Sequence, residues 1–546
     1  MYILSVQLLQ RVPNLFNPCV QLLSRLQREK MEEPINARAV DQSLKKIAKG
    51  GGLIFVGTLF GMAVQMVNRI LIVRSVPMAD YGIFSLGLIL FSMAGTLSQG
   101  GFSQSVPRFL GYYRGKGDEN RIRGIMKSAF KIELLLAGAV TVVLFCGARY
   151  IESFYQMQGL KTVIMIFAVG IPLFTLIRII TNIFRGFDRV EPTLYFKDIM
   201  TVSLRFFFLL LVVMVIPSLL HIVIAYVVAL AVTSVFTVSY YYRTQPVPLA
   251  GEVASMGKKL LFFSIPLFGT VFLAQLMRWT DVLMLGYFTS AEKVGLYNGA
   301  LPLCALIPLF LSSAGFIFVP VLSVLYSQGQ LSEMKKTYSI ITKWTFSCTL
   351  PLFLMIFVFS PLVLTFLFGP DYEGASNALK ILSVGYMFHV SLGPIGQNLI
   401  ILGRPKLIMI NNSAGLLINV VLNFLLIPLY GIDGAATATA VTYVSLNILA
   451  LMQVYRISRI HPFSRTYVNP LGFSLGLVVV FFAAFTMVTV QYWMLPFICV
   501  LFVVSYFLVI LLTKSFDRED IMLLKTLEKR TGINLKWLRK TLRRFL

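Results

Sequence analysis

About fourteen apolar segments, most of them close to 20 residues long, follow one another along this 546-residue chain. A helix of that length crosses the ~30 Å hydrocarbon core of a membrane. Hydrophobic residues make up 57% of the sequence and charged residues only 13%, and the runs are continuous rather than alternating as in barrel strands. The sequence therefore predicts an all-α integral membrane protein with spans at 51–73, 82–104, 129–148, 162–184, 199–216, 219–240, 261–288, 296–324, 344–366, 381–401, 407–429, 434–455, 471–490 and 494–513.

The sequence also repeats itself about 212 residues further on. GTLFGMAVQMVNRILIVRSVPMADYGIFSLG at 57–87 matches GTVFLAQLMRWTDVLMLGYFTSAEKVGLYNGA at 269–300. Such an internal repeat of about six membrane helices is a common plan of secondary transporters, which bind their substrate between the halves. We expect two pseudo-symmetric six-helix lobes, and the predicted organisation is an N-terminal extension (1–47), a first lobe (48–243), a second lobe (244–456), an extra helix pair (457–513) and a basic tail (514–546).

Lys and Arg residues are distributed unevenly between the two predicted sides of the membrane. The chain holds 48 of them against 23 Asp and Glu. Only five lie in the odd-numbered connections between spans: Arg74, Arg149, Lys161, Lys293 and Lys380. Because cationic residues gather in cytosolic loops, we expect both termini to be cytosolic and the protein to reside in the plasma or inner membrane. The charge of +25 then belongs to the cytosolic side and predicts no nucleic-acid partner.

Motifs of enzymatic catalysis and of ATP hydrolysis are missing from the sequence. It contains no Walker loop, no GxSxG and no HExxH. Its five cysteines and three histidines are dispersed, without the spacing of metal ligands. We expect no enzyme, no metal site and no cofactor other than Na⁺ or H⁺ as a coupling ion.

The two ends of the chain differ in character. Residues 1–30 lack the basic start and long apolar run of a signal peptide, so we expect them to be disordered or to precede a true start at Met31. Leucines at helical spacing among lysines and arginines follow residue 520. This pattern predicts a basic amphipathic helix on the anionic inner membrane surface, with a solvated basic tail as the alternative.

Three segments carry a family resemblance. They are ADYGIFSLG at 79–87, TDVLMLGYFTSAEKVGLYNGA at 280–300, and NVVLNFLLIPLYGIDGAATATAVTYV at 419–444. In this order and at these helix positions they resemble the Wzx-type flippases of lipid-linked oligosaccharides, within the multidrug/oligosaccharidyl-lipid/polysaccharide exporter superfamily. The resemblance implies two lobes around a V-shaped cavity, two extra helices, and transfer of a polyprenyl-(pyro)phosphate-linked oligosaccharide from the cytosolic to the outer leaflet. Membrane lipids and polysaccharide polymerases or glycosyltransferases are the expected partners.

Charged residues inside predicted spans are the candidates for handling such a substrate. A phosphate and a glycan lose their water in hydrocarbon, and ionisable residues in membrane helices mark transport pathways. Five of the seven in-span charges are positive, which suits an anionic head group. The cavity candidates are Arg69, Arg278, Asp281, Gln65, Asn68, Gln275, Arg178 and Arg205, and the ion-coupling candidates are Asp281 and Glu133.

Some of these positions have simpler interpretations. Lys131, Glu133, Arg178 and Arg205 lie near the predicted cytosolic edge, from which long side chains can snorkel to water. Asp281 has two possible partners. Arg69 is its counterpart in the repeat and would form an ion pair between the lobes, whereas Arg278 lies three residues earlier on the same helix. Both alternatives remain open at this point.

Two further features bear on mechanism. Gly100 and Gly101 near the cytosolic end of the second span indicate close packing or a hinge. Among alternative functions, a multidrug antiporter or a lipid II flippase of the same fold would share the predicted architecture. A basic interior fits an anionic lipid better than it fits a cationic drug.

Overall fold

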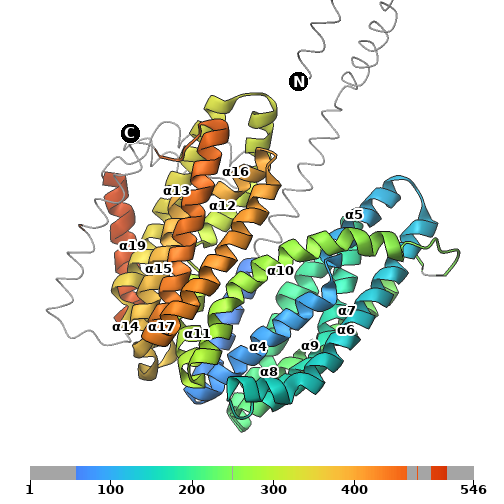
Figure 1. Ribbon diagram of the computed structural model, residues 1–546, viewed down its shortest axis with the longest axis horizontal. Coiled ribbons are helices and arrows are strands. Elements are labelled where there is room, and N and C mark those ends of the chain that lie inside the picture. The colour runs from blue at the N-terminus through green and yellow to red at the C-terminus, as the bar shows by residue number, and fades with distance from the viewer. Residues whose placement is uncertain (1–56, 249, 464–475, 477–493, 513–546) are drawn as a thin grey trace, which may run out of the picture. The chain divides into compact units, whose positions relative to one another are not determined.

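The computed structural model describes residues 57–248, 250–463, 476 and 494–512. These residues belong to one compact unit (Figure 1). The predicted N-terminal extension, the basic tail and, except for residue 476, the span 471–490 lie outside the described residues. A helix at 57–75 comes first. It is followed by α4 (Met78–Gln99), α5 (Phe102–Gly115), α6 (Glu119–Tyr155), α7 (Leu160–Gly186), the π-helix η2 (Thr193–Met200), α8 (Thr201–Val215), α9 (Leu219–Thr244), α10 (Gly257–Phe288), α11 (Ala291–Cys304), α12 (Leu309–Ser327), α13 (Leu331–Val358), α14 (Ser360–Phe368), the 3-10 helix η3 (Pro370–Ala375), α15 (Ser376–Ser391), α16 (Ile395–Ile401), α17 (Pro405–Ser458) and α19 (Leu495–Leu512).

The helices have the length and the surface of membrane spans. In the described part of the chain, nine are long and apolar enough to cross a membrane, and ten if the bent pair α11–α12 counts as one span. Large apolar side chains remain exposed along them, for example Val143, Met214 and Leu429, each at least 70% exposed. Such surface is stable against lipid and unstable against water. The predicted all-α membrane fold is confirmed, whereas the count of fourteen stays a prediction because one span lies outside the described residues.

One predicted span is wrong in its form. The segment 296–324 was expected to be a single helix, but α11 and α12 meet at an angle of 47°. The break falls between Cys304 and Leu309, and Pro308 immediately precedes α12. Proline at the start of α12 has no backbone N–H to continue the ladder of α11, which explains why the two helices separate here.

The longest helical stretch, α17, is a helical hairpin. Its 54 residues would extend about 81 Å at 1.5 Å per residue, far more than a membrane is thick. Gly431 interrupts it with φ 55° and ψ −125°, a conformation that a side chain would oppose. Beyond this break the chain returns: Asn411 bonds Gln453 and Asn419 bonds Thr439. The two halves therefore correspond to the predicted spans 407–429 and 434–455.

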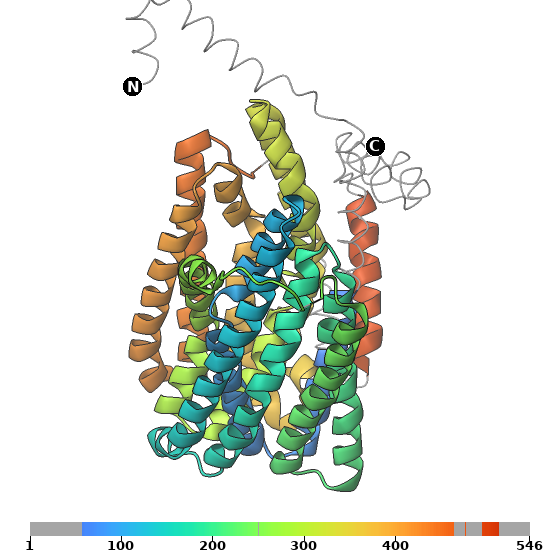
Figure 2. The same cartoon turned by 90° about the vertical axis from the view of Figure 1, so that its right-hand side faces the viewer.

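The internal repeat is visible in the positions of the helices. Three helices of the first lobe, α4, α6 and η2, each have a counterpart that begins 212 or 213 residues later, namely α11, α13 and α17. Figure 1 shows α6, α7, α8 and α9 gathered in one group and α13, α15 and α17 in another, as their packing contacts require. In Figure 2 most of the long helices follow a shared direction. We call helix 57–75 to α9 the first lobe and α10 to α17 the second lobe.

The two lobes meet where equivalent glycines face each other. A Cβ on Gly82 of α4 would lie 1.8 Å from the carbonyl oxygen of Ala291, and a Cβ on Gly295 of α11 would lie 2.4 Å from the carbonyl oxygen of Met78. Gly82 and Gly295 occupy the same place in the repeat, so the contact is reciprocal. No residue other than glycine allows two helix backbones to approach this closely.

Helix α10 connects the lobes in a second way. Its N-terminal part lies against the first lobe, where Ser264 bonds Ser105 of α5 at 2.6 Å. A Cβ on Gly101 would lie 2.3 Å from the Ser264 carbonyl oxygen, so the predicted close packing at the glycine pair is present. The C-terminal part of α10 packs against α11 and α17 of the second lobe. One helix thus carries contacts of both lobes.

Candidate functional site

Asp281 of α10 lies at the centre of a buried polar cluster in the second lobe. Its side chain is buried, with 3% relative exposure. Four neutral groups donate hydrogen bonds to its carboxylate: the Tyr297 hydroxyl at 2.7 Å, the Asn419 amide at 3.1 Å, the Asn423 amide at 2.9 Å, and the Thr439 hydroxyl. A buried carboxylate without such donors would carry a large desolvation cost. The four donors come from α11 and from both halves of α17.

Two further oxygen atoms of this cluster have no hydrogen-bond partner. They are the amide oxygens of Asn419 and Asn423, both buried. Each is bonded to the same amide carbon as a nitrogen that donates to Asp281, and a half-turn of the amide exchanges the two atoms. The carboxylate, two amide oxygens and the Thr439 hydroxyl form a set of hard oxygen ligands suited to a small cation.

The cluster differs from the common metal sites of proteins. No group of three His, Cys, Asp or Glu side chains that could hold a metal occurs within the described residues. One carboxylate provides a single negative charge, and the other ligands are neutral. Such a set matches a monovalent ion, whose charge it neutralises, better than a divalent ion.

The first lobe reaches the second through Arg69 and Tyr81. The Arg69 guanidinium donates to the backbone carbonyl of Asn298 in α11 at 3.0 Å, and the Tyr81 hydroxyl donates to the same oxygen at 3.3 Å. This carbonyl is free because Pro302, four residues further along α11, has no N–H to occupy it. The proline thus creates an acceptor on α11 that side chains of the other lobe fill.

Arg74 forms a second contact between the lobes. It follows Arg69 by five residues and donates to the carbonyls of Leu367, at 3.0 Å, and Phe366. Both carbonyls lie in the last turn of α14, where backbone oxygens lack helical partners and the helix dipole is negative. The second lobe therefore stabilises the positive charge of the Arg74 guanidinium at this helix end.

An aromatic row joins two arginines of the first lobe. Arg205 of α8 donates to the Tyr226 hydroxyl at 3.1 Å and lies 4.0 Å from the centre of that ring. The Tyr226 ring contacts Phe84 at 5.7 Å, and Phe84 lies 6.4 Å from Tyr81, which shares its acceptor with Arg69. Arg205 and Arg69 therefore lie at the two ends of one row of rings.

Neither of the ion pairs considered for Asp281 is present. The structure places four neutral donors on its carboxylate, and neither Arg69 nor Arg278 forms an ion pair within the described residues. Arg69 bonds the Asn298 carbonyl instead, and Arg278 is exposed. The repeat brings Arg69 and Asp281 to the same helix, α11, but to consecutive residues of it rather than to each other.

The snorkelling interpretation is wrong for Glu133. Helix α6 begins at Glu119, well before the predicted span, so Glu133 lies about 21 Å along it at 1.5 Å per residue. Its side chain is fully buried, and neither carboxylate oxygen has a hydrogen-bond partner. Lys131, two residues away, is exposed.

The remaining cavity candidates fall in two places. In the first lobe, Asn68 donates to the Val202 carbonyl at 3.3 Å, and the Arg178 guanidinium lies 5.2 Å from the centre of the Phe174 ring. Gln65 is exposed on helix 57–75, and Gln275 is half-buried on α10. The structure thus unites Asp281 with none of the other candidates by a direct hydrogen bond.

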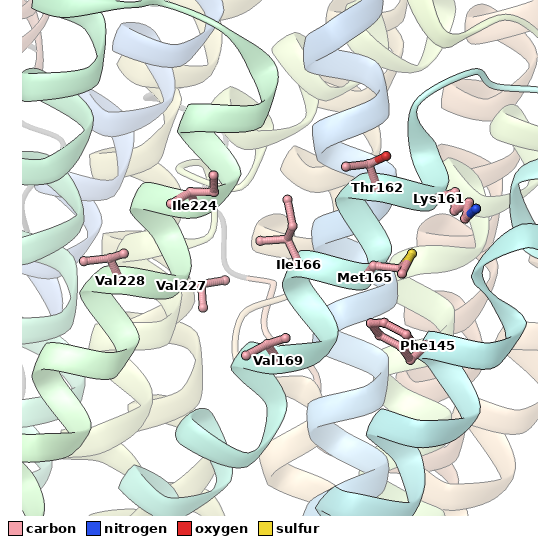
Figure 3. A pocket seen from close by; sticks show the side chains of 9 residues that line it. All are labelled: Phe145, Lys161, Thr162, Met165, Ile166, Val169, Ile224, Val227 and Val228. Carbon is pink, nitrogen blue, oxygen red and sulfur yellow. The ribbon is translucent and has the colours of Figure 1, made fainter.

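A hollow of about 570 Å³ lies elsewhere, between α6, α7 and α9 of the first lobe (Figure 3). It is lined mostly by apolar side chains, with Lys161 and Thr162 at one end: Phe145, Lys161, Thr162, Met165, Ile166, Val169, Ile224, Val227 and Val228. None of the predicted site residues lines it. Because Val169 and Phe145 are exposed, the hollow opens on the apolar outer surface of the helices.

Comparison with known families shows to which family the chain belongs. The sequence pattern of the family described as "Polysaccharide biosynthesis protein" matches residues 47–326, just over half of the chain. The chain belongs to this polysaccharide biosynthesis protein family. A second pattern, that of the MatE family, matches residues 266–425, which include Asp281 and the first half of α17.

Several known proteins are similar in sequence to this polysaccharide biosynthesis protein. An uncharacterized membrane protein of Methanocaldococcus jannaschii is 24% identical, over 76% of this chain and 85% of the relative. A Shigella flexneri protein described as an O-antigen transporter is 22% identical, over 73% and 96%. A Haloferax volcanii protein described as a flippase of low-salt glycan biosynthesis is 29% identical over 31% of this chain and 36% of the relative.

Solved structures show the same fold. The lipid II flippase MurJ in an inward closed conformation superposes with a TM-score of 0.70 at 15% identity, covering 84% of this chain and 97% of MurJ. An inward-facing multidrug resistance MATE family transporter of the MOP superfamily gives 0.60 at 14% identity, covering 73% and 95%. The predicted two-lobe, MATE-like membrane fold is therefore confirmed.

Sequence reasoning missed four residues that surround Asp281. Tyr297, Asn419, Asn423 and Thr439 all lie in segments that carried the family resemblance, yet none was assigned a role. The signal was the spacing of the two asparagines, four residues apart on one face of an apolar helix. Their common partner on α10, Asp281, lies 138 and 142 residues away in the sequence, and no local pattern gives that partner.

Proposed function

We propose that this polysaccharide biosynthesis protein moves a polyprenyl-(pyro)phosphate-linked oligosaccharide from the cytosolic to the outer leaflet by alternating access of its two lobes. Family membership and the names of the relatives support a role in glycan export. The fold supports transport between lobes related by an internal repeat. The polyprenyl chain would remain in lipid while the protein accommodates the polar head.

Unpaired arginines are the observation that carries this proposal. Within the described residues, none of the four arginines that lie inside predicted spans forms an ion pair: Arg69, Arg178, Arg205 and Arg278. An arginine inside a membrane helix costs about 2.5–3.5 kcal/mol even on lenient insertion scales. An anionic phosphate or pyrophosphate head group supplies the missing counter-charge. Arg69 and Arg205, at the ends of the aromatic row, are the proposed phosphate ligands.

The Asp281 cluster is the proposed ion-coupling site. Na⁺ fits it better than a proton, because a proton needs only the carboxylate and leaves the Asn419 and Asn423 amide oxygens without partners. Carboxylate, amide and hydroxyl oxygens are the ligands that hard cations prefer. No enzymatic step is part of this proposal, since translocation breaks no covalent bond.

The contacts of Arg69, Arg74 and Tyr81 are the proposed closure on the outer side. They lie around the first predicted outer loop, and both chain termini would then be cytosolic as the distribution of Lys and Arg predicts. The equivalent glycines Gly82 and Gly295 lie at the same end. Polymerases or glycosyltransferases of the same pathway are the proposed partners.

Export measurements test the proposal directly. In a host strain that lacks its own gene for this protein, the variant Arg69→Ala/Arg205→Ala should reduce glycan export roughly ten-fold or more, because each hydrogen bond to a charged group contributes about 1.5–3 kcal/mol. Lys at both positions should restore part of the export, since a point charge replaces a fork of donors. Lipid-linked oligosaccharide should accumulate in the cytosolic leaflet.

The matched control is Arg149→Ala, which removes an exposed arginine near the outer end of α6. It should export at the wild-type level. Wild-type export by the double alanine variant, at equal abundance in the membrane, would remove these arginines from the substrate site. Purified protein in vesicles that flips lipid II but no lipid-linked oligosaccharide would instead establish the alternative flippase.

A further inference from the structure

Two consecutive residues of α11 connect the cation cluster with the contact between the lobes. The Tyr297 hydroxyl donates to Asp281 at 2.7 Å, and the carbonyl of Asn298 accepts from Arg69 and Tyr81 of the first lobe. We propose that Tyr297 is the positioning residue through which a cation bound at Asp281 controls the contact of α11 with the first lobe. This inference rests on the proposed ion-coupled transport.

Tyr297 holds a special place among the four donors to Asp281. The other three, Asn419, Asn423 and Thr439, all belong to α17. Tyr297 alone belongs to α11, the helix whose backbone contacts α4 of the first lobe through Gly82 and Gly295. A change at Asp281 therefore reaches the backbone of α11, and with it the contact of α11 with α4, through this hydroxyl.

The chemistry of cation binding acts on that hydrogen bond. A cation beside Asp281 binds lone pairs of the carboxylate oxygens and so competes with the proton of the Tyr297 hydroxyl for these acceptors. The hydroxyl oxygen then either turns toward the cation or leaves the carboxylate. In both cases α11 changes its position relative to α10, because a fully buried tyrosine ring has no free space in which to move alone.

The hydrogen bonds to the Asn298 carbonyl also depend on the position of α11. The Asn298 carbonyl is available to the first lobe because Pro302 cannot donate to it. Hydrogen bonds weaken steeply once the donor–acceptor geometry leaves its narrow range. A small shift of α11 therefore breaks the bonds from Arg69 and Tyr81 and releases the first lobe.

The experiment measures binding and lobe movement separately. Spin labels at Gln158→Cys in the first lobe and Glu373→Cys in the second report the distance between the lobes, in full-length protein whose five native cysteines have been replaced. Distances are recorded in sodium and in choline chloride. The thermal shift caused by sodium reports binding in the same samples.

In the wild-type background we expect sodium to change the ratio of the populations with short and with long distance between the lobes by about five- to 150-fold, the usual range of coupling between sites. In Tyr297→Phe sodium should change this population ratio by less than about two-fold, which lies below the range of coupling between sites. Sodium should still raise the unfolding temperature of this variant, because the cation still binds. Pro302→Ala, which restores the helical donor to Asn298, should uncouple the lobes in the same way without removing any hydroxyl.

Two matched controls separate coupling from loss of stability. Tyr338→Phe removes another buried hydroxyl of the second lobe, bonded to the Leu392 carbonyl at 2.6 Å, and Pro172→Ala removes a proline inside α7. Both should keep the sodium response of the wild type. A full distance response in Tyr297→Phe or in Pro302→Ala overturns the inference alone. No sodium response in the wild type overturns the ion-coupled function together with it.

Discussion

At the scale of single residues, the buried Asp281 carboxylate of the second lobe is matched with neutral donors rather than with an opposite charge. Asp281 receives four such donors, and the amide oxygens of Asn419 and Asn423 remain open. If the carboxylate were paired with an arginine, its charge would already be neutralised and it would not bind a cation. The arrangement leaves one negative charge unpaired, so the proposed ion would bind and leave without the breaking of a buried ion pair.

The substitution Asp281→Asn tests the charge of this cluster. Sodium in 100-fold excess over its dissociation constant should stabilise the wild type by about 2.7 kcal/mol, and the variant should lose this stabilisation because its amide carries no charge. Thermal unfolding in sodium and in choline chloride measures the difference. The matched variant is Glu133→Gln, at the other buried carboxyl group. If the sodium effect disappears in Glu133→Gln and persists in Asp281→Asn, the ion site belongs to α6.

The residues that the sequence could not identify are those with distant partners. Asp281 and Arg69 were recognisable because charge is rare in apolar helices, and their equivalence followed from the repeat. Their actual partners depend on which face each helix turns toward its neighbour. A rotation of α11 by one residue, 100°, would turn Asn298 into the direction that Tyr297 has in the structure. The sequence alone does not determine that rotation.

At the scale of helices, prolines inside spans provide acceptors for other helices. At three of the prolines inside the described helices, a side chain from another helix donates to the carbonyl four residues earlier, which the proline leaves free. Pro172 leaves the carbonyl of Ala168 free, and Thr141 donates to it. Pro302 does the same for Asn298, whose carbonyl accepts from Arg69 and Tyr81. Pro351 does the same for Ser347, whose carbonyl accepts from Tyr506. The sequence shows each proline and hence each free carbonyl, but it does not show which helix supplies the donor.

The substitution Gly82→Ala tests the contact of α4 with α11. The new Cβ would lie 1.8 Å from the Ala291 carbonyl oxygen, which belongs to a helix backbone and cannot give way alone. We expect a destabilisation of about 1–3 kcal/mol, as for other overpacked sites, and reduced transport. Gly147→Ala is the matched control, because no atom lies within 4 Å of its Cβ position in α6. Thermal unfolding and export should be close to wild type for the control, and equal results for both variants would show that the lobes tolerate separation here.

At the scale of the whole molecule, the repeat builds two similar lobes, and these lobes contact each other both through equivalent residues, such as Gly82 and Gly295, and through residues without an equivalent. The positions of the helices follow the 212-residue offset, which is why the sequence predicted the architecture well. Helix α10 contacts both lobes, with Ser264 at the first and Asp281 at the second. Its counterpart, helix 57–75, also reaches the second lobe, through Arg69 and Arg74. The contact of Arg74 with the end of α14 lies across the lobe boundary, and breaking it is the most direct test of the proposed closure.

The substitution Arg74→Ala tests whether the lobes are held closed at their predicted outer side. The guanidinium donates to Leu367 and Phe366 at the negative end of α14, so its removal should favour separation of the lobes there by about 1.5–3 kcal/mol, the range for hydrogen bonds of charged groups. Spin labels at Gln158→Cys and Glu373→Cys should then report a larger population at long distance. Arg74→Lys, which keeps the charge but loses the fork, should give an intermediate population. An unchanged distance distribution in Arg74→Ala would show that Arg69, Tyr81 and the glycine contact hold this side closed by themselves.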